Sequence, residues 1–300
     1  MKKIFNITKT NSHKIITILG IKLKIKLNNL KINTSREEIS YIVAREIYSA
    51  LEVSKQHTKV FSEYQNYHHN DILSIVGCGP SINHYNNEIK NDVKIALNDA
   101  IFFDKFNFDY LFNWDIGVTI NTPNYYEIVK QYPCKKFYGH CIVENYENPL
   151  DNYSDYEHKI KHFYYSARHG WPAFNFGEII HRDLTTYPLM DFGSISFGAL
   201  HFALFTRPKK IYLIGLDTAN VGHILGADYE CTYDTQRMLN GYNKFKHFID
   251  IYYPDVDVIS VNPVGLKGLF KDVYTQSFVD AHPELLKENI EIINEDTENI

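Results

Sequence analysis

Short apolar runs recur between residues 72 and 261, and each stops at a glycine or an asparagine. They are Ile72–Val76, Val93–Leu97, Tyr110–Asn113, Ile211–Ile214 and Asp257–Val261. Runs of this length bounded by turn residues are typical of strands buried on both faces of a parallel sheet. Apolar helical patterns fall between them, notably Phe197–Phe205 and Asn240–Ile251. Strands alternating with helices predict an α/β fold with a Rossmann-like, mainly parallel sheet flanked by helices.

The N-terminal region has a different pattern. Residues 21–27 alternate strictly between aliphatic residues and lysine, which predicts a strand with one apolar and one cationic face. We expect Lys14–Leu19 to pair with it across a tight turn. Ser35 and Glu38 have the capping-box spacing of a helix start, and this helix is expected to run to about Ser54. The chain therefore opens with a small basic β-hairpin and a helix.

These patterns suggest three regions. Residues 1–70 hold the basic hairpin, the helix and a polar linker, and residues 71–275 form the α/β domain. Residues 276–300 are an acidic tail. Between the predicted strands lies an aromatic, irregular insertion around residues 132–190, which could form a lid over an acceptor site.

Composition narrows the class of protein. The 300 residues are 44% hydrophobic and 22% charged, which is ordinary for a globular protein, and the net charge of −5 gives no reason to expect nucleic acid. The four cysteines form no Cys-x-x-Cys pair, so we expect no structural zinc and a cytoplasmic location. Residues 1–36 contain nine Lys and Arg and no acid. Their lysines are either a solvated cap on the main domain or a peripheral contact with anionic lipid at the inner membrane face.

Candidate chemistry follows the predicted strands, because ligands bind at the carboxyl ends of parallel strands. The residues at those ends are Gly77, Cys78, Gly79, Pro80, Ser81, Asn98, Asn113, Asp115 and Asp217. The two glycines and Pro80 suit a tight turn into a helix, where N–H groups can bind an anion. The turn has neither the third glycine of a dinucleotide fingerprint nor a Walker lysine. A purely structural glycine turn is the alternative.

As a set, these motifs resemble a known group of enzymes. Gly-x-Gly-Pro-Ser at 77–81, a following strand that ends at Asn98, and the block from Gly193-Ser194 to Gly215-Leu216-Asp217 resemble bacterial family 42 sialyltransferases. They also resemble the motility-accessory-factor glycosyltransferases and the archaeal hydroxymethyl-dihydropterin diphosphokinases, which share an MptE-like domain. The resemblance covers roughly residues 71–270. Residues 8–26 look like a leader on some surface-polysaccharide glycosyltransferases.

The resemblance implies a glycosyltransferase that moves a nonulosonic acid such as sialic acid from a CMP-sugar donor to a surface glycan or glycolipid acceptor, as in lipooligosaccharide biosynthesis. The donor would lie over the Gly77–Ser81 turn, and we expect neither a cofactor nor a metal. The implied donor-binding residues are Gly77, Cys78, Gly79, Pro80, Ser81, Asn98, Asn113, Asp115, Gly193, Ser194, Tyr229 and Arg237. Tyr229 and Arg237 would neutralise the leaving phosphate. The general base would be His223 or Asp217, on a loop expected to fold over the nucleotide.

Two departures from the family pattern keep other functions open. Cys78 stands where the sialyltransferases have an asparagine, and no histidine lies near Gln236–Met238, where they have their base. A magnesium-dependent diphosphokinase that uses ATP is one alternative. A non-catalytic nucleotide-binding module is the other. The acceptor, the linkage and the oligomeric state stay open, with a homo-oligomer among the possibilities.

Overall fold

The computed structural model describes residues 5–9, 13–18, 21–26, 51, 53–113, 129, 131–141, 160–166, 180–219, 222 and 235–293. The chain divides into two compact units, Met1–Ile47 and Tyr48–Ile300. The division falls within the predicted helix rather than after the predicted linker at residue 70.

The first unit contains a three-stranded antiparallel sheet in the order β1-β2-β3. Its strands are β1 (Phe5–Lys9), β2 (His13–Ile18) and β3 (Ile21–Lys26). Ile16 pairs with Leu23, so the predicted antiparallel pairing within the basic hairpin is confirmed. Strand β1 extends the hairpin on the other side of β2.

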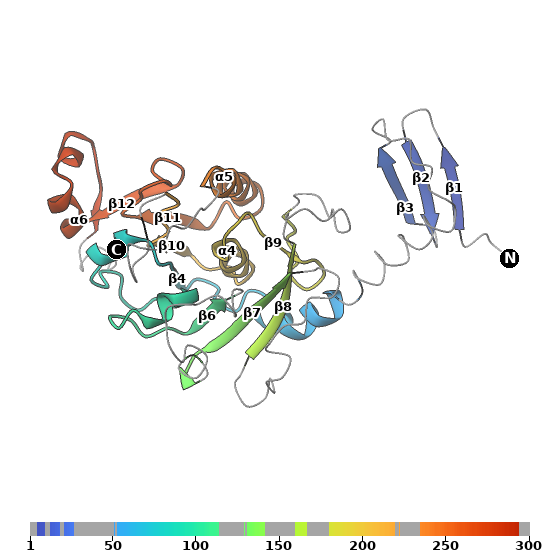
Figure 1. Cartoon of the computed structure of the whole chain (residues 1–300), viewed down its shortest axis with the longest axis horizontal. Coiled ribbons are helices and arrows are strands. Elements are labelled where there is room, and N and C mark those ends of the chain that lie inside the picture. The colour runs from blue at the N-terminus through green and yellow to red at the C-terminus, as the bar shows by residue number, and fades with distance from the viewer. Residues whose placement is uncertain are drawn as a thin grey trace. The chain divides into compact units, whose positions relative to one another are not determined.

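The second unit is an α/β fold of the general Rossmann-like kind, built on ten strands joined by nine parallel pairings (Figure 1). The strands are β4 (Ile72–Val76), β5 (Val93–Leu97), β6 (Tyr110–Asn113), β7 (Lys135–Cys141), β8 (Ile160–Ser166), β9 (Leu189–Met190), β10 (Lys210–Ile214), β11 (Asp257–Val261), β12 (Lys271–Thr275) and β13 (Ile292–Ile293). Their order across the sheet is β13-β12-β11-β10-β4-β5-β6-β7-β8-β9. The five strands that the sequence predicts are β4, β5, β6, β10 and β11, and all five are confirmed.

Strands β7, β8 and β9 come from the region that we expected to form a lid. Lys136 lies within β7 and is 2% exposed, and its ammonium group donates to the carbonyl oxygens of Tyr132 at 2.7 Å and Cys134 at 3.2 Å. Strand β7 begins with two lysines, so it lacks the mainly apolar run by which a buried strand is recognised. Three segments of this region therefore belong to the sheet.

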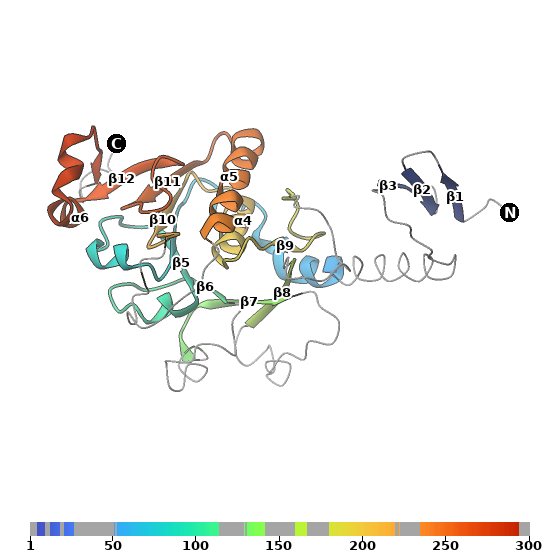
Figure 2. The same ribbon diagram turned by 45° about the horizontal axis from the view of Figure 1, so that its top comes forward.

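Side chains of successive strand residues alternate between two cores. In β4, Leu73 and Ile75 belong to one core, whereas Val76 belongs to the other. The first core is covered by α4 (Ser196–Phe205) and α5 (Thr235–Tyr252), which lie side by side in both views (Figures 1 and 2). The second is covered by the short 3₁₀ helices η2 (Pro80–His84) and η3 (Asn98–Phe102).

The two long helices have different sequence patterns because they are buried to different extents. All ten residues of α4 are buried, and its composition is apolar all round. Helix α5 buries one face through residues spaced three and four apart, among them Met238, Tyr242 and Phe245. Each large apolar side chain buried in this way contributes about 1.5–3 kcal/mol.

The polar stretch expected to be a linker is part of the second unit. Residues 53–61 are helical and lead into η1 (Ser62–Tyr64), and Val60, Phe61 and Tyr64 are buried in the first core. At the other end of the chain, α6 (Gln276–Ala281), η5 (Pro283–Lys287) and β13 continue the fold beyond β12 (Figure 1). Among the described helices, none is long and apolar enough to cross a bilayer.

Candidate functional site

The order of the strands reverses between β4 and β10. From β4 the chain adds β5 to β9 in one direction, and it then returns to place β10 on the other side of β4. After β4 it continues to η2 on the second core, and α5, the helix that follows β10, packs on the first core. Ligands of open α/β sheets bind at such a switch point, outside the carboxyl ends of the strands.

The turns after β4 and β10 pack directly against each other. The amides of Gly77 and Gly79 donate to the carbonyl oxygens of Ile214 and Gly215, each at 2.8 Å. A Cβ atom on Gly77 would lie 2.7 Å from the Gly215 oxygen, and one on Gly79 would lie 2.5 Å from the Asp217 carboxyl carbon. Close approach within the protein therefore explains both glycines, as the structural alternative expects.

Asp217 joins the two turns. Its Oδ2 accepts the Ser81 amide at 3.0 Å, and its Oδ1 accepts the Ser81 hydroxyl. The side chain is 5% exposed, and burial raises the pKa of its carboxyl group, whereas the bonds from Ser81 lower it. The Ile82 amide donates to the Gly79 carbonyl oxygen. The amides of Gly77, Gly79, Ser81 and Ile82 thus already donate to acceptors within the protein.

Cys78 and Asn98 lie on the neighbouring turns after β4 and β5. The Cys78 sulfur is 3.5 Å from the Leu97 carbonyl oxygen, and burial raises the pKa of the thiol, which stays protonated at neutral pH. Asn98 opens η3 with a φ of +46°. Its Oδ1 atom is buried and accepts no hydrogen bond from the residues that the structure describes. A buried acceptor of this kind calls for a donor.

A second group of polar side chains surrounds the start of α4 and α5. The Ser196 hydroxyl donates to Ser194 Oγ at 2.9 Å and accepts the Tyr242 hydroxyl at 2.7 Å. The Tyr242 hydroxyl also interacts with Thr218, so it links the Ser194–Ser196 loop to the turn after β10.

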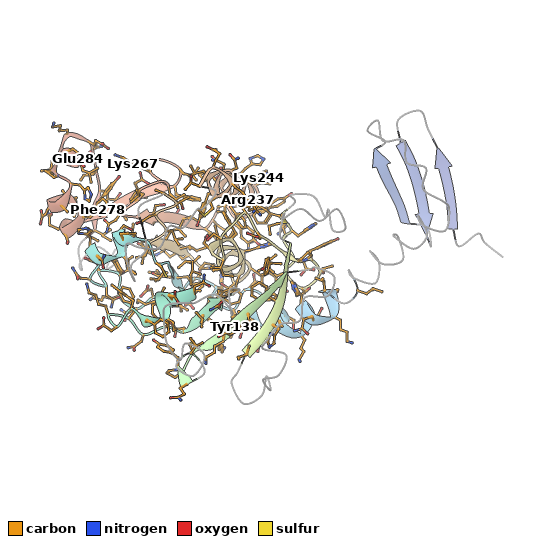
Figure 3. The ribbon with its side chains drawn as sticks, viewed as in Figure 1. Tyr138, Arg237, Lys244, Lys267, Phe278 and Glu284 are labelled. Atoms are coloured by element: carbon orange, nitrogen blue, oxygen red, sulfur yellow. The ribbon has the colours of Figure 1, made fainter. Side chains whose placement is uncertain are left out.

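Arg237 lies near the start of α5 (Figure 3). Its guanidinium donates to the Asp191 carbonyl oxygen at 3.1 Å and lies 3.6 Å from the Asp191 carboxylate. Gly193, with a φ of +93°, packs beside the Arg237 side chain. These contacts connect α5 to the loop before α4.

Backbone strain is present at the same edge. Thr218 has a φ of +47°, which is unusual for a β-branched residue. The Gly265 amide donates to the Asp217 carbonyl oxygen at 2.7 Å, and the Thr218 hydroxyl donates to the Leu216 carbonyl oxygen at 3.2 Å. Strain of this kind is often found at functional sites, where surrounding contacts maintain it.

The structure places some of the predicted residues and leaves others undescribed. The Gly77–Ser81 turn, Asn98, Asn113 and Asp217 are all at the carboxyl edge, and Asn113 is fully buried at the end of β6. Asp115, His223 and Tyr229 lie outside the described residues.

Sequence reasoning did not single out Ser196, Thr218 or Tyr242. For Tyr242 a signal existed, since its position on α5 belongs to the buried helical stripe. The pattern of buried positions does not, however, predict the hydrogen-bond partners of the Tyr242 hydroxyl.

Two features bear on metals. Among the described side chains, no three of His, Cys, Asp and Glu gather to hold a metal ion. The chain does contain one Asp-x-Asp, Asp255-Val256-Asp257, but it lies at the amino end of β11, where Asp255 pairs with Arg207 at 2.8 Å. Asp-x-Asp is thus on the opposite edge of the sheet from the switch point.

Comparison with protein-family models and with curated proteins finds no match to this chain.

Proposed function

We propose that this protein is a glycosyltransferase that binds a CMP-sugar at the β4/β10 switch point and transfers the sugar, a nonulosonic acid, to a glycan or glycolipid acceptor. The observation that carries the proposal is the buried, unpartnered Oδ1 of Asn98 beside that switch point. The motif resemblance of residues 71–270 supports the choice of CMP-sugar as donor.

In this proposal the residues have separate roles. Asn98 Oδ1 accepts a hydrogen bond from the base or ribose of the nucleotide, and Arg237 and Ser194 stabilise the phosphate. Asp217 positions the two turns rather than removing a proton, because Ser81 already donates to both of its oxygens. The amides at 77, 79, 81 and 82 already have acceptors, so the phosphate contacts fall to the loop before α4 and the start of α5.

The reaction would be a direct displacement. A base removes the proton of the acceptor hydroxyl, the oxygen forms a bond to the anomeric carbon, and CMP leaves with the electron pair of the broken bond. His223 remains the favoured base in this proposal, because a loop histidine has a suitable pKa for the task.

Nucleotide binding tests the first half of the proposal. Thermal unfolding is measured with CMP, CDP, UDP and ATP, each with and without Mg²⁺. We expect CMP to raise the midpoint most and independently of Mg²⁺. Stabilisation only by ATP with Mg²⁺ would favour the diphosphokinase, and no stabilisation by any nucleotide would contradict nucleotide binding altogether.

Measurement of turnover tests the second half of the proposal, the transfer of the sugar. We expect His223→Ala to lower the rate of CMP release from a CMP-sugar by 10²–10⁴-fold while leaving CMP affinity nearly unchanged, as for loss of a general base. Near-normal turnover would exclude His223 from the mechanism. CMP binding without turnover in the wild-type chain, with suitable acceptors present, would favour a non-catalytic binding module.

A further inference from the structure

Charge is distributed very unevenly between the two units. The unit Met1–Ile47 contains ten Lys and Arg and three Glu, a net charge of +7, so with −5 overall the second unit carries −12. An acidic body is repelled by an anionic surface, whereas a strongly basic N-terminal unit is attracted to it. The opposite net charges of the two units therefore indicate a separate role for the unit Met1–Ile47.

The strand register sorts the residues of this unit into two faces. Lys22, Lys24 and Lys26 alternate along β3 and share one face of the sheet. Their partners on β2 are Thr17, Ile15 and His13. By the same pairings, the opposite face holds Phe5, most of the aliphatic positions of the three strands, and the pair Lys9 and Lys14, whereas Ile15 shares the face of the three β3 lysines.

The cationic face is also at an edge of the sheet. Strand β3 is the last strand in the order β1-β2-β3, so its lysines form a row along the border. On the other face, Lys9 and Lys14 are directly paired between β1 and β2. That pair therefore does not belong to the row of lysines on β3.

Residue types distinguish between anionic partners. Nucleic-acid surfaces typically rely on arginine forks and stacked aromatic rings. Residues 5–26 contain no arginine, and Phe5 is the one aromatic residue besides His13. Lysines beside an aliphatic surface are instead the composition that favours anionic lipid headgroups.

We propose that the unit Met1–Ile47 docks this protein on an anionic lipid bilayer through the cationic face that carries Lys22, Lys24 and Lys26. The proposal does not depend on the proposed transferase activity. A lysine near an anionic membrane surface strengthens binding by about fivefold. Loss of all three should therefore weaken binding by roughly 100-fold.

The test uses co-sedimentation of the full chain with vesicles of phosphatidylcholine alone or mixed with phosphatidylserine. We expect binding to the mixed vesicles only, and loss of that binding as the salt concentration rises toward 1 M, where the Debye length is about 3 Å. The variant Lys22→Gln/Lys24→Gln/Lys26→Gln should lose binding by roughly 100-fold. The matching triple Lys→Arg variant should retain it, which separates loss of charge from loss of fold.

A charge-matched control removes three exposed lysines of the second unit, in Lys55→Gln/Lys59→Gln/Lys209→Gln. We expect this variant to bind like the wild-type chain. Equal loss in both triple variants would contradict a role for the cationic face, as would equal binding by the β3 triple variant and the wild type. Binding to RNA but not to vesicles, measured in the same buffer, would also overturn the proposal.

Discussion

The two edges of the parallel sheet hold their polar groups in different ways. At the amino edge, the His68 imidazole lies between Asp71 and Tyr110, with both N···O distances 2.8 Å. The Lys135 ammonium lies within 5.1, 5.3 and 5.7 Å of the ring centres of Tyr64, Tyr67 and Tyr110. At these positions charge and hydrogen bonding serve to hold strands and helices together.

The carboxyl edge keeps features that packing alone does not require. Asn98 has a buried oxygen without a partner among the described residues, and Thr218 has a strained backbone. The amino edge also has a buried oxygen without a hydrogen-bond partner among the described residues, Asp92 Oδ2 just before β5, but the other Asp92 oxygen pairs with Lys94. In the function proposed above, the carboxyl edge binds the ligand and the amino edge serves as scaffold.

The largest predicted effect concerns the contact between the two turns. Gly215 has a φ of +62°, and a Cβ atom there would lie 2.9 Å from the Gly77 carbonyl oxygen. We expect Gly215→Ala to lower the free energy of unfolding by about 3–4 kcal/mol, from left-handed strain and the clash together. Denaturant unfolding measures the change.

Gly268 provides the matched control, because its φ is +77° but nothing lies within 4 Å of a Cβ atom. Gly268→Ala should cost only about 1 kcal/mol. Equal costs for the two variants would show that the turns after β4 and β10 are not tightly packed.

Acid should destabilise the scaffold through His201. This residue is buried within α4, and burial lowers the pKa of its imidazole to about 4. Between pH about 6.5 and 4 the unfolded chain therefore binds a proton that the folded chain does not, so stability falls as the pH falls. The loss should reach roughly 3 kcal/mol at pH 4. We expect His201→Gln to flatten this slope in unfolding measured across that range, and an unchanged slope would contradict the assignment.

Asp217, at the carboxyl edge, should give a slope opposite in sign to that of His201. Because burial raises the pKa of its carboxyl group above the ordinary value, the folded chain holds this proton to higher pH than the unfolded chain does. Its contribution to stability is therefore lost as the pH rises through the raised pKa. Relative to Asp217→Asn, the wild type should be more stable at low pH than at neutral pH. A constant difference would show that the carboxylate titrates normally.

A smaller effect is expected for His68 at the amino edge. Since a carboxylate only accepts, Nδ1 of His68 donates to Asp71, and Nε2 shares a hydrogen bond with the Tyr110 hydroxyl. His68→Ala should lower the free energy of unfolding by about 2 kcal/mol and leave nucleotide affinity unchanged. A marked loss of CMP affinity, measured by calorimetry, would contradict the claim that the amino edge has no part in binding the nucleotide.

The smallest effect is expected for the residue that carries the proposed function. Asn98→Ala should weaken CMP binding by about 1–2 kcal/mol, the scale of one lost hydrogen bond. Asn91 is the matched control, because it also has a positive φ, +59°, but is exposed at the amino end of β5. Asn91→Ala should share any cost in stability without weakening CMP binding. Equal loss of affinity in both variants would point to a general effect on the fold.

The sequence predicts the strands that are mainly apolar. It does not predict elements in which buried residues are mixed with polar or charged ones. Strands β4, β5, β6, β10 and β11 are short, mainly apolar runs, although β5 also contains the buried Lys94. Strand β7 is harder to recognise because it begins with Lys135-Lys136 and also contains Gly139 and His140, although the ammonium group of Lys136 is buried against carbonyl oxygens. The helix at 53–61 is hidden for a related reason, since its buried positions are scattered among polar ones.

The location of the candidate site follows from the sequence, but its internal contacts do not. Residues at the ends of parallel strands must share an edge, so Asn98 and Asp217 could be placed there in advance. The bond between Ser81 and Asp217 joins residues 136 positions apart and depends on how closely two turns approach. Periodicity and motif spacing contain no information about that distance.

Hydrogen exchange with and without saturating CMP tests the central claim most directly, because it compares the two edges in one measurement. If the β4/β10 switch point binds the nucleotide, CMP should slow exchange in peptides that cover residues 77–84, 97–103, 191–198 and 214–219. Peptides that cover the amino-edge residues 62–71 should exchange at the same rate with and without CMP. Protection confined to the amino edge, or no protection at residues 77–84 and 97–103 when CMP is bound, would contradict the account.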